Sequence, residues 1–216
     1  MKLFFRINIT IFLLIMLRCC IGLFYLRVAH LEPDDLKWIN KSKDLSGVLV
    51  SSTGQRIKLY TYSHYISNDQ SPIYFTFAGG SDYNDAYAIY SYIVQKNSKK
   101  YDGSLTIYKD GKSDSLSFRA GFENMYAGGP LTSKYVHQAT ILNQPFDDCI
   151  IVNETNSHVS YRHPDDTVFI SEYILSKRYG PLYFKFDNDE EFIREFIVKR
   201  AKSIQQDTIL SPNKDI

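Results

Sequence analysis

The chain has 216 residues, of which 25 are Lys or Arg and 24 are Asp or Glu, for a formal net charge of +1 at pH 7. The charge is uneven, because residues 1–27 contain four basic residues and no acidic one, which leaves 21 basic and 24 acidic residues in the other 189. Nucleic-acid binding needs clustered Lys and Arg. The composition therefore argues against that class and predicts one domain, over residues 28–216.

Residues 1–27 have the composition of a signal peptide or a membrane anchor. An apolar run ends at Leu26 and is interrupted once, by Arg18. Three interpretations stay open: a cleaved secretory signal, a lipoprotein signal acylated on Cys19 or Cys20, and an uncleaved anchor long enough to cross about 30 Å of hydrocarbon. All three export the remainder. We therefore expect a cell-envelope protein, periplasmic or surface-exposed, that is either tethered to the membrane through its N-terminus or secreted.

Outside this segment there is a single cysteine, Cys149. No disulfide within the domain and no thiolate metal cluster can form. Asp147 and Asp148 precede the cysteine, residues 150–152 continue as a typical strand, and acidic neighbours raise the pKa of a thiol. We expect a buried and unreactive thiol.

The remaining domain consists of short alternating segments rich in Tyr, Phe, Ile, Val and Thr, separated by Gly, Asn and Asp. One helical turn is expected first, over residues 31–39, because Pro33 and acidic residues stand at its start. The expected strands are, in chain order, residues 47–51, 56–65, 72–77, 86–95, 104–109, 113–119, 134–142, 148–152, 167–177 and 182–186.

Residues 191–198 suit a strand or a helix, and we expect a strand with a helical tail and a frayed end from residue 205. Residues 79–80 and 128–130 are expected turns, since glycines occupy them. About ten strands without helical crossovers predict an all-β fold behind an N-terminal hydrophobic helix. The sheet is expected to be mainly antiparallel, in the form of a barrel, a half-barrel or a sandwich.

Both ends of the domain resemble a known group of proteins. The beginning has Leu-Lys-Trp-Ile at 36–39 followed by an aliphatic and Ser-Gly hairpin at 48–54, and the end has Ser-Lys-Arg-Tyr-Gly at 176–180 followed by a strand and an acidic turn at 183–191. In this arrangement the chain is similar to small exported and lipoprotein-like proteins of Bacteroidota. The resemblance implies an exported all-β protein and no particular reaction.

The same resemblance gives meaning to three short triplets. Exported proteins of such bacteria are glycosylated on Ser or Thr within Asp-Ser/Thr-apolar sequences. Ser115, Thr167 and Thr208 occupy such triplets here. They are candidate glycosylation sites. The alternative explanation is that these triplets are ordinary sequences at the point where a turn leads into a strand.

Aromatic residues are abundant, with seventeen Tyr and fourteen Phe. Five tyrosines lie between residues 87 and 108, and three of them, Tyr87, Tyr90 and Tyr92, share one expected strand. Rows of tyrosine on a strand suit contact with a protein, a glycan or a lipid. The alternative is that tyrosine has a high strand propensity and is simply half-buried.

His158, His163 and Asp165 are the nearest approach to a metal constellation, because His and carboxylate ligands suit zinc or iron. A polar surface loop is the alternative, and no nucleophile or phosphate-binding motif accompanies these residues. The sequence favours a non-catalytic envelope protein without a cofactor, whose β-domain binds a partner protein, glycan or lipid. A metal-dependent exported hydrolase is the second hypothesis.

Overall fold

The computed structural model describes residues 9–16, 27–39, 45–67, 83–84, 86–110, 115–123, 125–132, 135–159 and 169–210. Its helices are α2 (Pro33–Leu36) and α3 (Glu195–Leu210), besides a helical segment at residues 9–16. Its strands are β1 (Arg27–Val28), β2 (Gly47–Ser51), β3 (Arg56–Ser67), β4 (Tyr83–Asn84), β5 (Ala86–Lys96), β6 (Lys99–Lys109), β7 (Leu116–Phe122), β8 (Met125–Pro130), β9 (Val136–Ile141), β10 (Gln144–Asn153), β11 (His158–Val159), β12 (Ile170–Ser176), β13 (Gly180–Phe186) and β14 (Glu191–Arg194).

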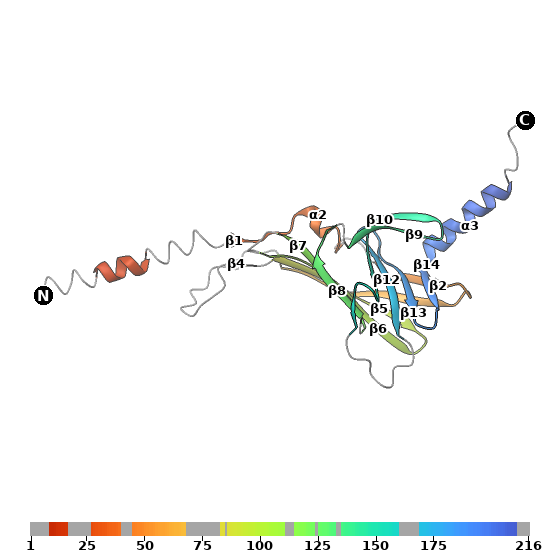
Figure 1. Ribbon diagram of the computed structural model, residues 1–216, viewed down its shortest axis with the longest axis horizontal. Helices are drawn as coiled ribbons and strands as arrows, with labels where there is room; N and C mark the ends of the chain where they lie inside the picture. Colours follow the sequence, from red (N-terminus) through yellow and green to blue (C-terminus); the bar gives the residue numbers. More distant parts are fainter. Residues whose placement is uncertain are drawn as a thin grey trace, which may run out of the picture.

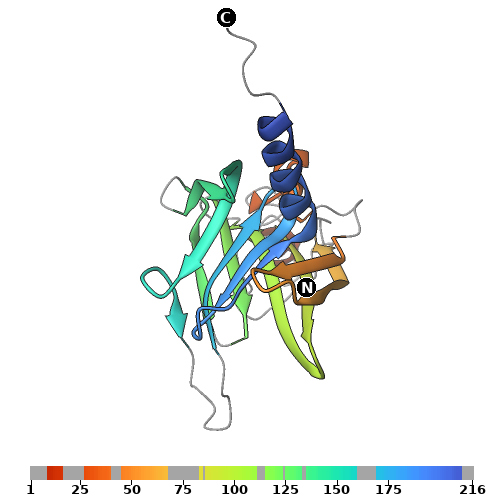
Figure 2. The same cartoon turned by 90° about the vertical axis from the view of Figure 1, so that its right-hand side faces the viewer.

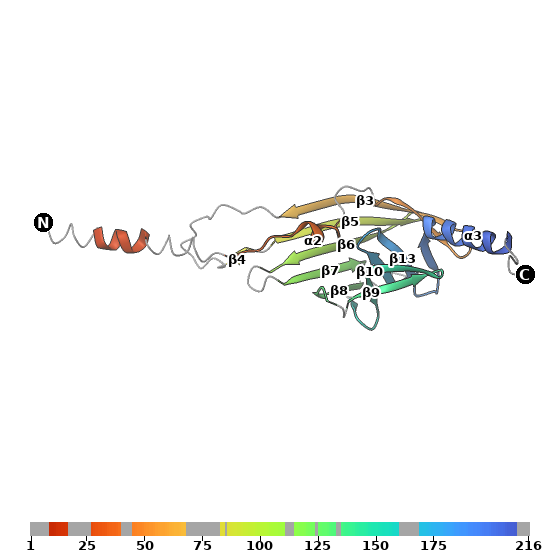
Figure 3. The same cartoon turned by 90° about the horizontal axis from the view of Figure 1, so that it is seen from above.

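Twelve of these strands form one sheet in the order β11-β8-β7-β6-β5-β3-β2-β14-β13-β12-β10-β9, and every neighbouring pair in it is antiparallel. Strands β1 and β4 form a separate parallel pair. Figure 3 shows β3, β5, β6, β7 and β8 side by side in one layer. The predicted antiparallel all-β fold is confirmed.

The sheet curls so that its two halves face each other (Figure 1), and contacts between aromatic rings join them. The ring of Tyr92 on β5 lies 6.1 Å from that of Phe184 on β13, although three strands separate β5 from β13 in the sheet order. Phe122 on β7 lies 6.0 Å from Tyr173 on β12 and 4.6 Å from Phe184. The concave face is therefore the core and the convex face is the outside of a half-barrel.

Alternation along β5 decides which side chains enter this core. Ala88, Tyr90, Tyr92 and Val94 are all fully buried, because successive side chains of a strand point to opposite faces. The ring of Tyr92 lies flat against its cross-strand partner Gly103. A Cβ atom at that glycine would stand 2.3 Å from the ring, so only glycine fits beneath it.

The helical turn expected near the start of the domain is α2, with proline at its first turn. The backbone N–H of Glu32 donates a hydrogen bond of 2.9 Å to the Asp35 carboxylate, which caps the turn. Trp38 and Ile39 follow it and are 3% and 1% exposed. This short element is thus held to the sheet by its apolar residues.

Two expectations need correction. Residues 191–194 form β14, as expected, but the helix that follows continues to Leu210, so the frayed end predicted from residue 205 is wrong as far as residue 210. Residues 128–130 belong to β8, not to a turn. Figure 2 shows α3 rising away from one end of the sheet. The strand expected at residues 72–77 lies outside the described residues.

In the N-terminal segment, residues 9–16 are helical, and the large apolar side chains among them are between 44% and 61% exposed. Within the described part of the chain, no helix has both the length and the apolar character needed to cross a membrane. The hydrophobic helix predicted for the segment as a whole stays a prediction.

Candidate functional site

The structure separates the three tyrosines that the sequence placed together. Tyr90 and Tyr92 are 0% exposed, so their placement on a binding face is contradicted by their burial. Tyr87 is 39% exposed, since an odd spacing along the strand turns it to the opposite face. The ring of Tyr87 lies 5.7 Å from the ring of Tyr65 on β3. A tyrosine-bearing outer face therefore exists, and Tyr87 is the only one of the three that belongs to it.

Beside this face lies a groove of about 610 Å³ on the outside of β6, β7, β8 and β11, which we call the outer trough. Four strands contribute to its lining. The lining residues on the convex face include Ser104, Thr106, Tyr108, Arg119, Gly121, Tyr126, Gly128 and His158.

Strand register explains the floor of the outer trough. Ser104, Gly121, Tyr126 and His158 are successive cross-strand partners over β6, β7, β8 and β11. Directly opposed side chains on one face of a sheet are about 4.5–5.5 Å apart at Cβ. Gly121 has no side chain and Ser104 has a short one, whereas Tyr126 has a large ring. The surface of the sheet is therefore low at Gly121 and rises at Tyr126. The tyrosine is 48% exposed, and its ring lies 5.7 Å from the His158 ring.

The next row forms the opposite wall. Thr106, Arg119 and Gly128 are successive partners over β6, β7 and β8. The guanidinium carbon of Arg119 lies 5.4 Å from the centre of the Tyr108 ring, a cation–π contact that holds the side chain in place. A Cβ at Gly128 would lie 3.3 Å from Cγ of Arg119 and 2.9 Å from a backbone oxygen, so this glycine makes room for the arginine stem.

The aromatic surface continues beyond the outer trough. Tyr108 is the direct cross-strand partner of Tyr87, which in turn contacts Tyr65. A strip of tyrosine rings thus runs from β3 over β5 to β6 and ends at Arg119. Such rings offer an apolar body and a polar tip to a ligand.

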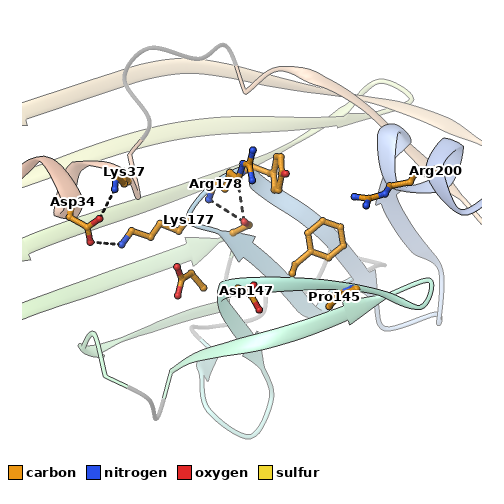
Figure 4. Close-up of a pocket in the computed structure, with 11 residues that line it drawn as sticks. Asp34, Lys37, Pro145, Asp147, Lys177, Arg178 and Arg200 are labelled. Carbon is orange, nitrogen blue, oxygen red and sulfur yellow. Dashed lines mark hydrogen bonds and ion pairs between the residues drawn. The ribbon is translucent and has the colours of Figure 1, made fainter.

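A second hollow, the polar cleft, has a volume of about 690 Å³ and lies where α2, β10, the β12–β13 turn and α3 meet (Figure 4). Its charged side chains are Asp34 and Lys37 from α2 and the residue after it, Asp147 and Asp148 from β10, Lys177 and Arg178 from the turn, and Arg200 from α3. Acids and bases are mixed in it.

Three of the charged side chains in the polar cleft form ion pairs with one another. The Asp34 carboxylate accepts hydrogen bonds from Lys177 at 2.7 Å and from Lys37 at 2.8 Å, and these lysines lower its pKa to about 2. Asp147 accepts a hydrogen bond of 2.9 Å from Gln138. We interpret the cleft as a structural clamp that ties α2 to the β12–β13 turn.

Cys149 lies close to the polar cleft but in the core. Its thiol is fully buried, and burial raises its pKa to about 11. The side chain contacts the backbone oxygen of Phe146, with a sulfur–oxygen distance of 3.4 Å. The predicted buried thiol is confirmed.

Of the expected metal ligands, His158 lies on the wall of the outer trough, while His163 and Asp165 lie outside the described residues. The described residues contain no group of three or more His, Cys, Asp or Glu side chains that could hold a metal ion. The hydrolase hypothesis stays a prediction, and elemental analysis of protein purified without added metal tests it.

The candidate modification sites are only partly visible. Ser115 is exposed just before β7, and Thr208 lies in α3. Thr167, Cys19 and Cys20 lie outside the described residues. Glycosylation and lipidation therefore stay predictions.

Sequence reasoning missed Arg119, Gly121 and Tyr126 as site residues. Because of Gly128 and Gly129, residues 128–130 were expected to form a turn, so the β7–β8 hairpin that pairs Gly121 with Tyr126 and Arg119 with Gly128 was not predicted. The alternation of Met125, Ala127 and their neighbours is the one signal that could have revealed this strand.

Comparison of the chain with known protein families, with curated proteins and with solved structures gives no match. The half-barrel and its outer trough are therefore interpreted on their own chemistry.

Proposed function

We propose that this chain is a non-catalytic cell-envelope protein whose β-domain binds a glycan in the outer trough. The proposed location rests on the basic and apolar pattern of residues 1–27. The apolar side chains of residues 9–16, exposed to at least 44%, are consistent with an environment other than water.

The observation that carries the proposal is the pairing of an exposed aromatic ring with a low floor that has a few polar side chains beside it. A sugar ring has an apolar C–H face and a rim of hydroxyl groups. The exposed ring of Tyr126 can stack on that face, while Ser104 and Thr106 offer hydroxyl groups and His158 offers a ring nitrogen to the rim. A concave surface with a few convergent polar groups is typical of a small-ligand site.

A partner protein and a lipid suit this surface less well. A stable protein interface buries about 800 Å² on each side and has an apolar centre. The outer trough is instead a concave groove, in which the hydroxyl groups of Ser104 and Thr106 lie beside the exposed ring of Tyr126. A lipid chain would need an apolar cavity, whereas the rings of Phe122 and Phe184 on the concave side already lie 4.6 Å apart.

The test is calorimetric titration of the full-length protein, in detergent solution, with a panel of neutral and acidic oligosaccharides. Gly121→Val adds an isopropyl group to the floor, and Tyr126→Ala removes the stacking ring. We expect each to weaken binding by about tenfold or more. The Cβ atom of Gly121→Val has room in the fold, because its nearest neighbour would lie at 3.8 Å. An unchanged melting temperature checks that the two γ-methyl groups are accommodated as well.

Tyr62→Ala is the matched control, since Tyr62 is also an exposed tyrosine but lies on β3, outside the outer trough. It should leave the affinity unchanged. Failure of every oligosaccharide to bind, or equal losses in the control and in the trough variants, would contradict the proposed function.

A further inference from the structure

Resting on the proposed function, we infer that the outer trough is specific for acidic sugars and that Arg119 binds the carboxylate of a uronic acid. Arg119 is the only Lys, Arg, Asp or Glu among the lining residues of the outer trough. The site is therefore cationic, although the domain that carries it is mildly acidic.

The guanidinium group of Arg119 is available to a ligand. The residue is exposed, and it forms no ion pair with any residue that the structure describes. Exposed arginines often point freely into solvent. This one is held over the Tyr108 ring at 5.4 Å, and its stem lies beside Gly128. Less conformational entropy is lost on binding when a side chain is already oriented.

The chemistry of the group selects a carboxylate. Guanidinium presents a planar fork of N–H donors that matches the two oxygens of a carboxylate, and such bidentate pairs are stronger than neutral hydrogen bonds. One fixed positive charge balances one negative charge. A uronic acid carries a single carboxylate on its ring, and that group lies beside the C–H face that stacks on an aromatic ring.

The spacing of the site fits such a sugar. Arg119 and Tyr126 are diagonal neighbours on β7 and β8, because Gly121 is the direct partner of Tyr126 and Arg119 is that of Gly128. Diagonal neighbours of this kind are about 7–8 Å apart. The guanidinium lies farther along the groove, over the Tyr108 ring. An oligosaccharide with one ring stacked on Tyr126 can therefore cross the floor at Gly121 and place the carboxylate of a uronic acid unit at the guanidinium.

The test uses matched pairs of ligands: tetragalacturonate and tetramannuronate, each beside its carboxyl-reduced, neutral counterpart. Calorimetric titration of the full-length protein should give about tenfold tighter binding of an acidic member than of its neutral counterpart. Arg119→Gln should make the two affinities equal by weakening only the acidic member. Arg119→Lys, which keeps the charge and loses the fork, should retain part of the preference.

Arg200→Gln on α3 removes an exposed arginine outside the outer trough and should change neither affinity. Equal binding of both members by the unmodified protein, or an unchanged preference in Arg119→Gln, overturns the inference while sugar binding stands. A preference for sulfated over uronic tetrasaccharides overturns the carboxylate assignment. Binding of no member of either pair overturns the proposed function as well.

Discussion

Replacing Gly103 by alanine tests how the core of the half-barrel is built. The Cβ added at this position would lie 2.3 Å from two carbon atoms of the Tyr92 ring and 2.6 Å from its hydroxyl oxygen. The ring cannot move aside freely, because it is fully buried and is stacked on Phe122 with centres 5.8 Å apart. The strand or the ring must therefore shift, and overpacking of this kind costs about 2–3 kcal/mol.

The measurement is the free energy of unfolding from urea titration, together with the melting temperature. A loss of about 2–3 kcal/mol corresponds to a fall of about 4–12 °C for a chain of this size. Gly121→Ala is the matched control, because it places the same methyl group on the neighbouring strand with its nearest atom at 3.8 Å. The control should keep or slightly raise the melting temperature, since alanine has less backbone entropy to lose than glycine.

The double variant Gly103→Ala, Tyr92→Leu separates the clash from other effects. Leucine lacks the flat ring, so the added methyl should cost less in this background than in the native one, by about 1 kcal/mol or more. A Gly103→Ala variant as stable as the unmodified protein would refute the packing of Tyr92 on this glycine.

The remaining predictions concern groups whose environment is unusual. Tyr90, Tyr92 and Tyr173 have buried hydroxyl groups with no hydrogen-bond partner among the described residues. Tyr173→Phe should therefore raise the free energy of unfolding by about 1 kcal/mol. A clear loss of stability in urea titration would show that the hydroxyl is paired. The depressed pKa of Asp34 means that its ion pairs stabilise the fold above pH 4 and that this contribution is lost as the pH falls toward 2. The melting temperature of Asp34→Asn should accordingly fall less steeply over that range, and parallel curves would speak against the assignment. In a Cys19→Ser, Cys20→Ser background, Cys149 should react with a thiol reagent at pH 8 only after unfolding, because its pKa is raised to about 11; rapid labelling of the folded protein would contradict its burial.

The fold could be predicted from the sequence to the extent that it depends on local periodicity. The alternation over residues 86–95 predicted the strand that the structure shows as β5, and Pro33 with its acidic neighbours predicted the helical turn α2. Alternation identifies two faces but does not say which face meets the core. Alternation separates Tyr87 from Tyr90 and Tyr92, but the structure of the opposite half of the sheet was needed to show that the face with Tyr90 and Tyr92 is the buried one.

The outer trough could not be predicted because it is a product of pairing between strands. Its floor requires that Ser104, Gly121 and Tyr126 stand in one row, and this register depends on the two connections that join β6 to β7 and β7 to β8. Arg119 is an ordinary charged residue of a strand until Tyr108 and Gly128 are placed beside it. Such a site leaves no motif in the sequence.

The most direct test of the account is to observe the tyrosine rings while an oligosaccharide is added. In NMR spectra of full-length protein with labelled tyrosines, assigned by single substitutions, titration with tetragalacturonate should shift the ring signals of Tyr108 and Tyr126 and leave those of Tyr90, Tyr92 and Tyr173 in place. The outer rings line the outer trough, whereas the inner rings lie in the core. Shifts confined to the inner rings, or no shift at saturating sugar, would contradict binding on the outer face.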